Sequence, residues 1–315
     1  MNFYYFLFKK ISLALLGVFI TLIFSFVFLG IFINPFPEKP IVVQLFEYLG
    51  SLFTFKYGKI ISPSISHSFI NPALFFFYYS KYSIIFYLST FIFSLVLGTC
   101  IGIFWGYKIH TWSEVITNIF IFIFSAIPTF ILAPLGIIFA ESIDLPINFV
   151  EPGILGISFT IRSLIIPIII LSFSTTSIIA IITKKNLANI LSQEYVLLAK
   201  TNGMNNLQIF KKVIFKNLMI EQLNYLVLIF ITMVSYGLII ERIFQIPGQS
   251  LLLSNILRSH ELYIMITFIF FTSLFLYFAQ AILEIFYHML KVDNKLNLNF
   301  SIKRRTHNLF KKETR

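Results

Sequence analysis

The sequence predicts an all-α membrane protein that crosses the bilayer with six helices. The prediction rests on the composition, on six long apolar stretches and on the distribution of the positive charges. Of the 315 residues, 58% are apolar and only 12% are charged. A soluble domain usually contains about a quarter charged residues, so this chain has too few to cover itself with a polar surface.

Six apolar stretches are long enough to cross a membrane, because about 20 helical residues span the hydrocarbon layer. A β-barrel would instead show alternating segments of about ten residues. The first stretch follows Lys9 and Lys10, as in a signal peptide, but it is longer than usual and lacks a small-x-small cleavage site. We therefore expect six retained helices: Ile11–Ile33, Ser83–Tyr107, Val115–Ala140, Ser163–Thr183, Gln222–Ile240 and Ile264–Leu290.

The positive charges predict the orientation of these helices. With the amino terminus in the cytoplasm, 17 of the 24 Lys and Arg residues fall on the cytoplasmic side, eight of them after Leu290. This asymmetry accounts for the net charge of +11 without nucleic-acid binding. We therefore expect both termini to be cytoplasmic.

These helices divide the chain into regions. We expect a cytoplasmic amino terminus (1–10), a first helix (11–33), an extracytoplasmic segment (34–82), a five-helix core (83–290) with a cytoplasmic loop at 184–221, and a basic cytoplasmic tail (291–315). In the second helix small residues recur every fourth position, which lets another helix approach closely; they are Gly98, Gly102 and Gly106. Cys100 is the only cysteine and the histidines are isolated, so neither a disulfide nor a metal site is predicted.

The loop at 184–221 is the most distinctive part of the core. Its first half has few helix breakers and is predicted to continue the fourth span as a helix as far as Gly203. Asn205 or Asn206 can cap a second helix. That helix is predicted to have an apolar face of Leu207, Phe210, Ile214 and Leu218 and a polar face of Gln208, Lys212 and Lys216.

Amphipathicity leaves two interpretations of this loop open. Its lysines can contact the anionic head groups of membrane lipid, and this is the simpler interpretation. Alternatively, the loop can dock a cytoplasmic partner.

The segment QEYVLLAKTNG (Gln193–Gly203) resembles the EAA loop of binding-protein-dependent ABC importer permeases, in the form typical of the dipeptide, oligopeptide and nickel permeases. Leu197 replaces the usual Arg, Asn202 the usual Lys, and Glu221 stands where proline is common. The positions that match are Glu194, Tyr195, Val196, Ala199, Lys200 and Gly203, followed by Lys212, Lys216 and Asn217.

A second segment, ERIFQIPGQSLLLSNIL (Glu241–Leu257), resembles the extracytoplasmic signature of the same family. Gln249 and Ser250 stand where Leu and Gly are usual. The residues that match are Glu241, Phe244, Pro247 and Gly248. The resemblance covers nearly the whole chain, and 163–248 is its most specific part.

The resemblance implies a bacterial cytoplasmic-membrane protein with the type I ABC importer permease fold, in which the loop at 184–221 carries a coupling helix. It also implies the partners: a second homologous permease chain, two cytoplasmic ATPases and an extracytoplasmic binding protein or lipoprotein. The only Gly-Lys pair, Gly58–Lys59, lacks the frame of a phosphate-binding loop. ATP and Mg are therefore expected on the partner ATPases, and this chain is expected to be a transport subunit without catalytic residues.

The substrate implied by the resemblance is an oligopeptide or dipeptide, with nickel or another small solute as the alternative. A proton-coupled carrier is a third, more distant possibility. For that function the sequence offers Glu284 and His288, which lie four residues apart near the cytoplasmic end of the sixth helix. Both are also close enough to the interface for a structural role.

Overall fold

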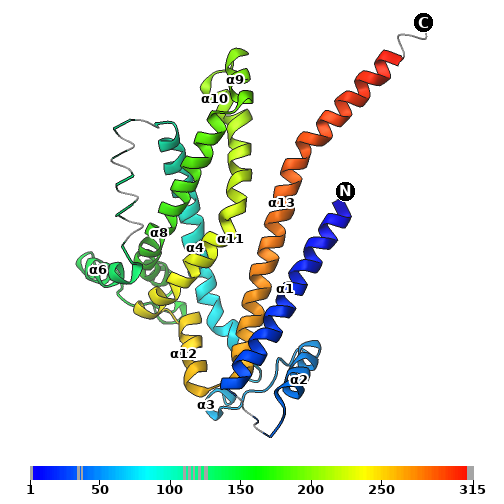
Figure 1. Ribbon diagram of the computed structural model, residues 1–315. Coiled ribbons are helices and arrows are strands. Elements are labelled where there is room, and N and C mark those ends of the chain that lie inside the picture. Colours follow the sequence, from blue (N-terminus) through cyan, green and yellow to red (C-terminus); the bar gives the residue numbers. More distant parts are fainter. Residues whose placement is uncertain are drawn as a thin grey trace.

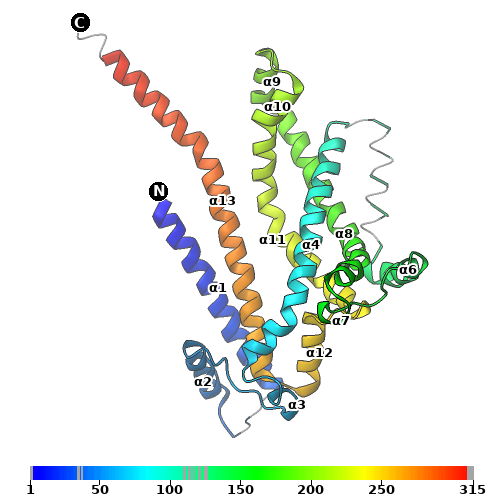
Figure 2. The same cartoon turned by 180° about the vertical axis from the view of Figure 1, so that it is seen from behind.

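The structure is a computed structural model that describes residues 3–310 except 34, 35, 37, 109, 110, 113, 114, 116, 117, 120, 121 and 124–126; the side chains of 292–310 are not described. The described residues form helices and the turns between them, without strands. Long helices run alongside one another, with α9 and α10 at one end of the molecule and α2, α3 and α12 at the other (Figure 1). Figure 2 shows the same arrangement from behind.

The helices in chain order are α1 (Phe3–Phe32), α2 (Ile41–Phe53), α3 (Pro63–Ser66), α4 (Pro72–Gly106), α6 (Thr129–Ser142), α7 (Pro152–Leu155), α8 (Ile157–Leu191), α9 (Glu194–Thr201), α10 (Asn206–Ile209), the π-helix η1 (Phe210–Ile214), α11 (Phe215–Ile243), α12 (Gln249–Ser259) and α13 (Leu262–Phe310).

Five of the predicted membrane helices are present in the described part of the chain as helices long and apolar enough to span a bilayer: Tyr4–Phe32, Pro72–Gly106, Ile157–Leu191, Asn206–Ile243 and Leu262–Lys291. The sixth, predicted at Val115–Ala140, falls partly outside the described residues. Its second half is α6, an apolar helix of 14 residues.

All five of these helices begin before the residue that hydropathy predicts, and α4 and α8 are two clear examples. α4 begins at Pro72 rather than Ser83, because the side chain of Asn71 accepts a hydrogen bond from the Leu74 amide at 2.9 Å and proline is favourable in the first turn. The segment between α1 and α4 is therefore shorter than the predicted 34–82. α8 likewise begins at Ile157 rather than Ser163.

The closest helix pair is α4 against α8. Gly98, Gly102 and Gly106 lie on the face of α4 that meets α8. A Cβ atom would lie 2.7 Å from Ile179 at the first position and 2.6 Å from Leu187 at the third, both shorter than real contacts. The absence of a side chain thus allows the two backbones to approach along three turns of helix.

α1 and α13 form a second packed pair. Tyr277 of α13 lies over Gly17, and Thr21 is 3.3 Å from the Tyr277 hydroxyl. Near the α9 end of the molecule, Lys10 of α1 forms an ion pair with Glu284. At the opposite end the pair continues into a buried cluster with α2, which includes Phe26, Tyr48 and Tyr263.

Replacing Gly102 with valine tests the α4–α8 contact. The added Cβ would lie 2.8 Å from the carbonyl oxygen of Ala180 and closer still to Thr183. Overpacking of this kind typically costs about 1–3 kcal/mol, so the unfolding temperature of the purified protein in detergent should fall. Gly50→Ala is the control, because no atom lies within 4 Å of a Cβ at that helical position. Equal unfolding temperatures for Gly102→Val and the wild type would contradict the close contact.

Candidate functional site

The loop between α8 and α11 is built on a small apolar core of its own. The core joins the end of α8, both short helices of the loop and the start of α11. Each of its buried side chains is less than a tenth exposed; they are Leu187, Ile190, Val196, Ala199, Ile209, Ile214 and Leu218. Because these side chains come from all parts of the loop, the loop is a compact extension of α8 and α11.

The prediction of one continuous helix from α8 to Gly203 is wrong, because α8 ends at Leu191 and a separate helix, α9, follows. It breaks at Ser192 and Gln193, and Gln193 takes an extended conformation with φ −77° and ψ 146° before α9 begins at Glu194. The break changes the direction of the chain, so that Val196 and Ala199 of α9 are buried in the same cluster as Ile190 of α8. Burial of these two side chains is the physical reason for the break.

Gly203 ends α9 in a left-handed conformation, with φ +76°. Its amide donates to the carbonyl of Lys200 at 3.0 Å, and the amide of Met204 donates to the carbonyl of Ala199 at 3.2 Å. This pair of bonds is a Schellman motif, for which glycine is preferred because it pays no Cβ penalty. A side chain at Gly203 would meet no atom within 4 Å, so the constraint is backbone conformation and not space.

The second loop helix is capped by Asn205. The Asn205 side chain accepts from the amide of Gln208 at 2.8 Å, and the Gln208 side chain accepts from the amide of Asn205 at 3.2 Å, forming a capping box. A cap at Asn205 or Asn206 was predicted, and the structure places it at Asn205.

The predicted apolar face of this helix is wrong at its first position. Leu207 is 64% exposed, whereas Ile209, which was not predicted, is buried with Ile214 and Leu218. The π-helix η1 follows directly after α10 and has more residues per turn than an α-helix. It therefore rotates the residues before it relative to those after it, and Ile209 replaces Leu207 in the core.

The residues matched to the EAA loop divide between the surface and the core. Glu194, Tyr195, Lys200 and Lys212 are exposed, and Lys216 is partly exposed. Val196 and Ala199 are buried in the core of the loop.

An exposed apolar patch on the same loop was missed by sequence reasoning. Leu197 and Leu198 are 54% and 62% exposed, and Leu207 lies on the following helix. Leu197 and Leu198 lie on α9, outside the helices that are long and apolar enough to span a bilayer, and Leu207 lies one residue inside the span that begins at Asn206. Exposed leucines in this position are typical of an interaction surface, and Leu197 also occupies the position where the family usually has Arg.

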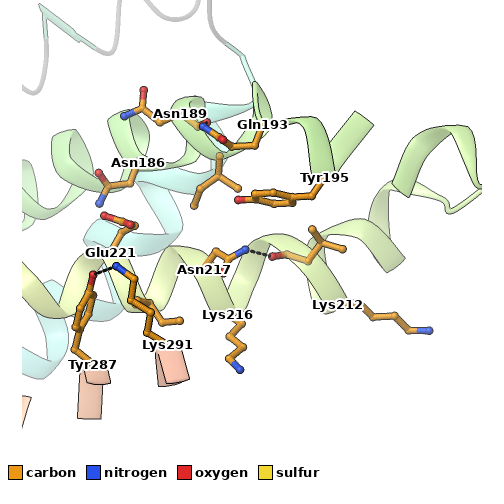
Figure 3. Close-up of a pocket in the computed structure, with 13 residues that line it drawn as sticks. Asn186, Asn189, Gln193, Tyr195, Lys212, Lys216, Asn217, Glu221, Tyr287 and Lys291 are labelled. Carbon is orange, nitrogen blue, oxygen red and sulfur yellow. Dashed lines mark hydrogen bonds between the residues drawn. The ribbon is translucent and has the colours of Figure 1, made fainter. Parts of the chain in front are cut away.

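A groove of about 660 Å³ lies beside the loop, between the end of α8, the start of α11 and α13 (Figure 3). Asn217 donates to the carbonyl of Val213 at 3.0 Å, and Lys291 donates to the Tyr287 hydroxyl at 2.7 Å. Partial burial raises the pKa of Tyr195 above its ordinary value. The polar and charged residues that line the groove are Asn186, Asn189, Gln193, Tyr195, Lys212, Lys216, Asn217, Glu221, Tyr287 and Lys291.

The second predicted set, from Glu241 to Gly248, lies at the opposite end of the molecule. Glu241 is fully buried and accepts a hydrogen bond from the Ser250 amide at 2.9 Å, which holds the first turn of α12. Gly248 is needed for space: a Cβ there would lie 2.8 Å from the Glu241 carboxylate and closer to the Ser83 hydroxyl. Phe244 is buried in the main core, and Pro247 lies in the turn between α11 and α12.

A similar arrangement at Glu261 was not predicted. This buried carboxylate accepts hydrogen bonds from the amides of Ile61, at 2.8 Å, and Ser62. It ties the segment before α3 to the start of α13. Glu284 and His288 also have structural partners, because Glu284 pairs with Lys10 and His288 stacks on Phe6 with ring centroids 4.1 Å apart.

Residues 98–291 match the family model of the binding-protein-dependent transport system inner membrane component. The match covers more than half of the chain and includes α8, the loop, α11, α12 and the membrane part of α13. The chain belongs to this family, and it is the permease component of an ABC transporter, a multi-pass inner membrane subunit that is not itself catalytic.

Curated relatives are distant. A putative peptide transport system permease protein of Brucella suis biovar 1 is 24% identical over 229 residues, which cover 71% of each chain. A corresponding protein of Brucella abortus (strain 2308) is also 24% identical over 229 residues, with the same coverage. A nickel import system permease protein of Staphylococcus aureus (strain USA300) is 23% identical over 259 residues, or 82% of this chain and 74% of that protein.

Substitutions at Gly203 test the Schellman motif. Gly203→Val should destabilise the loop by about 1 kcal/mol or more, because a β-branched residue is strained at positive φ. Gly203→Asn should be much milder, since asparagine tolerates this conformation and the space is open. Hydrogen exchange of the 194–206 amides is the measurement, with faster exchange expected in the valine variant only. Equal exchange in the two variants would show that the turn does not constrain the loop.

Proposed function

We propose that this chain is one of two permease subunits of an ATP-driven importer of oligopeptides or dipeptides, and that its α8–α11 loop couples ATPase movement to the membrane helices. In this proposal the loop end and both termini face the cytoplasm. The proposal is carried by one observation: the loop forms a single apolar core with the ends of α8 and α11. A body built in this way can transmit a displacement without bending.

The exposed face of the loop offers contacts to an ATPase. Glu194 and Lys200 can form ion pairs or hydrogen bonds, Tyr195 adds an aromatic ring, and Lys212 and Lys216 extend the basic surface. Leu197, Leu198 and Leu207 provide apolar area next to these charges. Apolar anchors surrounded by polar groups are the usual composition of a protein–protein interface.

A buried polar contact just beyond the loop joins α11 to α4 and α8. The Gln222 side chain on α11 donates to Thr99 of α4 at 3.2 Å and to Thr183 of α8. Gln222 follows the loop within the next turn of α11 after Leu218. Displacement of the loop therefore reaches α4, α8 and α11 together.

In the proposed cycle, ATP and Mg are held by the partner ATPases, and substrate arrives from an extracytoplasmic binding protein or lipoprotein. ATPase closure shifts the permease between inward-open and outward-open states. Such a shift requires that ATP and substrate bind the two states with unequal affinity. In this chain, the signature from Glu241 to Gly248 holds the α11–α12 turn at the extracytoplasmic end.

Charge reversal at Glu194 tests the docking of the ATPase. Like-charge contacts across an interface cost several kcal/mol, so Glu194→Lys should reduce ATPase co-purification and substrate uptake by more than about tenfold. Asn202→Lys is the control, because it places a lysine at another exposed position of the same loop, although it changes the charge by one unit and not by two. Normal co-purification by Glu194→Lys would remove this residue from the interface.

Uptake measurements test the substrate. Peptide transport is favoured by the putative peptide permeases among the relatives, and the nickel permease makes nickel the second candidate. A strain lacking this gene should lose most uptake of a labelled dipeptide or oligopeptide mixture and keep nickel-63 accumulation, and the gene on a plasmid should restore uptake. Loss of nickel accumulation with normal peptide uptake would reverse the assignment.

A further inference from the structure

Two cavities follow one another in the seam between α11 and α13. The first is the groove beside the loop, where Lys212, Lys216 and Lys291 are found. The second, of about 300 Å³, lies directly beyond it along both helices. Its apolar lining residues are Leu223, Val227, Leu228, Ile231 and Leu283, and its polar ones are Asn224, Gln280 and Glu284.

Lysines predominate among the charged residues of the groove, and Figure 3 shows them spread along it: Lys291 lies near Asn186 and Glu221, whereas Lys212 and Lys216 extend away from Asn186. Three lysines and a single carboxylate, Glu221, are among the described residues that line it. The Asn186 side chain is only 7% exposed, and its amide nitrogen has no hydrogen-bond partner among the described residues. Figure 3 shows this amide directed into the space between α8 and α11. A buried donor of this kind costs free energy until a ligand or water accepts from it.

From the composition of the helices, we infer that the two cavities lie at different depths in the bilayer. The groove is at the level where the apolar parts of α8, α11 and α13 give way to Lys184, Lys216 and Lys291. Lipid head groups occupy this level, and lysines at helix ends reach toward it. The second cavity lies along the apolar parts of α11 and α13, at the level of the acyl chains. The polar residue Glu284 is already paired there with Lys10.

We propose that an anionic phospholipid occupies this seam, with its phosphate in the groove and an acyl chain in the second cavity. Basic pockets between membrane helices are known sites for anionic head groups. A free phosphate would use the lysines but not the apolar cavity, so the pair of cavities favours the lipid. The proposal requires only that the basic end of the molecule lies at a membrane surface, and it does not depend on the transported substrate.

Lipid retention by the purified complex tests the site. The permease, with the subunits that co-purify with it, is equilibrated with micelles containing equal amounts of phosphatidylglycerol and phosphatidylcholine, and native mass spectrometry counts the bound lipids. The wild type should retain phosphatidylglycerol preferentially. Replacing Lys212, Lys216 and Lys291 with Gln should reduce this preference at least about fivefold.

The control removes the same charge from the same end of the molecule. Lys9→Gln, Lys185→Gln and Lys211→Gln in one chain leave the seam untouched and should keep the preference, because none of these lysines lines either cavity. Equal losses in the two triple variants, or no preference in the wild type, would overturn the proposal by showing that only general surface charge acts.

A second variant tests the acyl cavity with all the lysines in place. Val227→Phe narrows the cavity and should lower phosphatidylglycerol retention, while its unfolding temperature shows that the chain is folded. Inorganic phosphate at millimolar concentration should not displace the lipid. Displacement by phosphate, together with full retention in Val227→Phe, would assign the groove to a free anion. If the isolated permease retained phosphatidylglycerol but the complex did not, a partner subunit would occupy the seam in the complex. Either of these two results would overturn the proposed lipid site.

Discussion

The close approach of α4 and α8 is the contact on which the rest of the structure depends. Three glycines remove the side chains that would separate the two helices, and each faces a different residue of α8. The last of these contacts, between Gly106 and Leu187, also connects the helix pair to the loop core, because Leu187 is buried there with Ile190 and Val196. One turn earlier, Thr183 lies against Gly102 and also accepts from Gln222 of α11. Packing and hydrogen bonding thus join three membrane helices just below the loop.

The opposite end of the molecule uses buried carboxylates to hold its connections. Glu241 accepts from the amide of Ser250, and Glu261 from the amides of Ile61 and Ser62. Burying a carboxylate is costly unless donors compensate it, and backbone amides supply such donors without side-chain entropy. Each carboxylate fixes a segment that hydropathy alone cannot place: the start of α12 in one case and the segment before α3 in the other.

Sequence reasoning succeeded where the cause of a structure is local. The apolar stretches predicted five described spans, because helices in lipid must be apolar and must satisfy their own backbone. A helix end at Gly203 and a cap at Asn205 or Asn206 were predicted, and the structure has both, with the cap at Asn205, because a turn glycine and a capping side chain depend on the residue itself.

Predictions failed where tertiary packing decides. Packing of the loop on itself explains the break at Gln193, the π-helix and the burial of Ile209. The spacing of apolar residues along the sequence does not indicate such packing. The early start of α4 at Pro72 was missed because its first turns are rich in tyrosine, which lowers hydropathy without breaking the helix. The groove also escaped prediction, because it joins residues of α8, α11 and α13 that are far apart in sequence.

These contacts divide the membrane helices into two groups. α4, α8 and α11 are joined at the loop, whereas α13 packs along α1 through Tyr277, Glu284 and His288. α11 and α13 meet lower in the membrane, where Phe230 and Phe275 lie 5.7 Å apart, and they diverge toward the loop end (Figures 1 and 2). A displacement applied to the loop would be taken up between these two helices. The seam that we assign to a phospholipid lies at this boundary, so its occupant would fill the space that movement of the loop opens and closes.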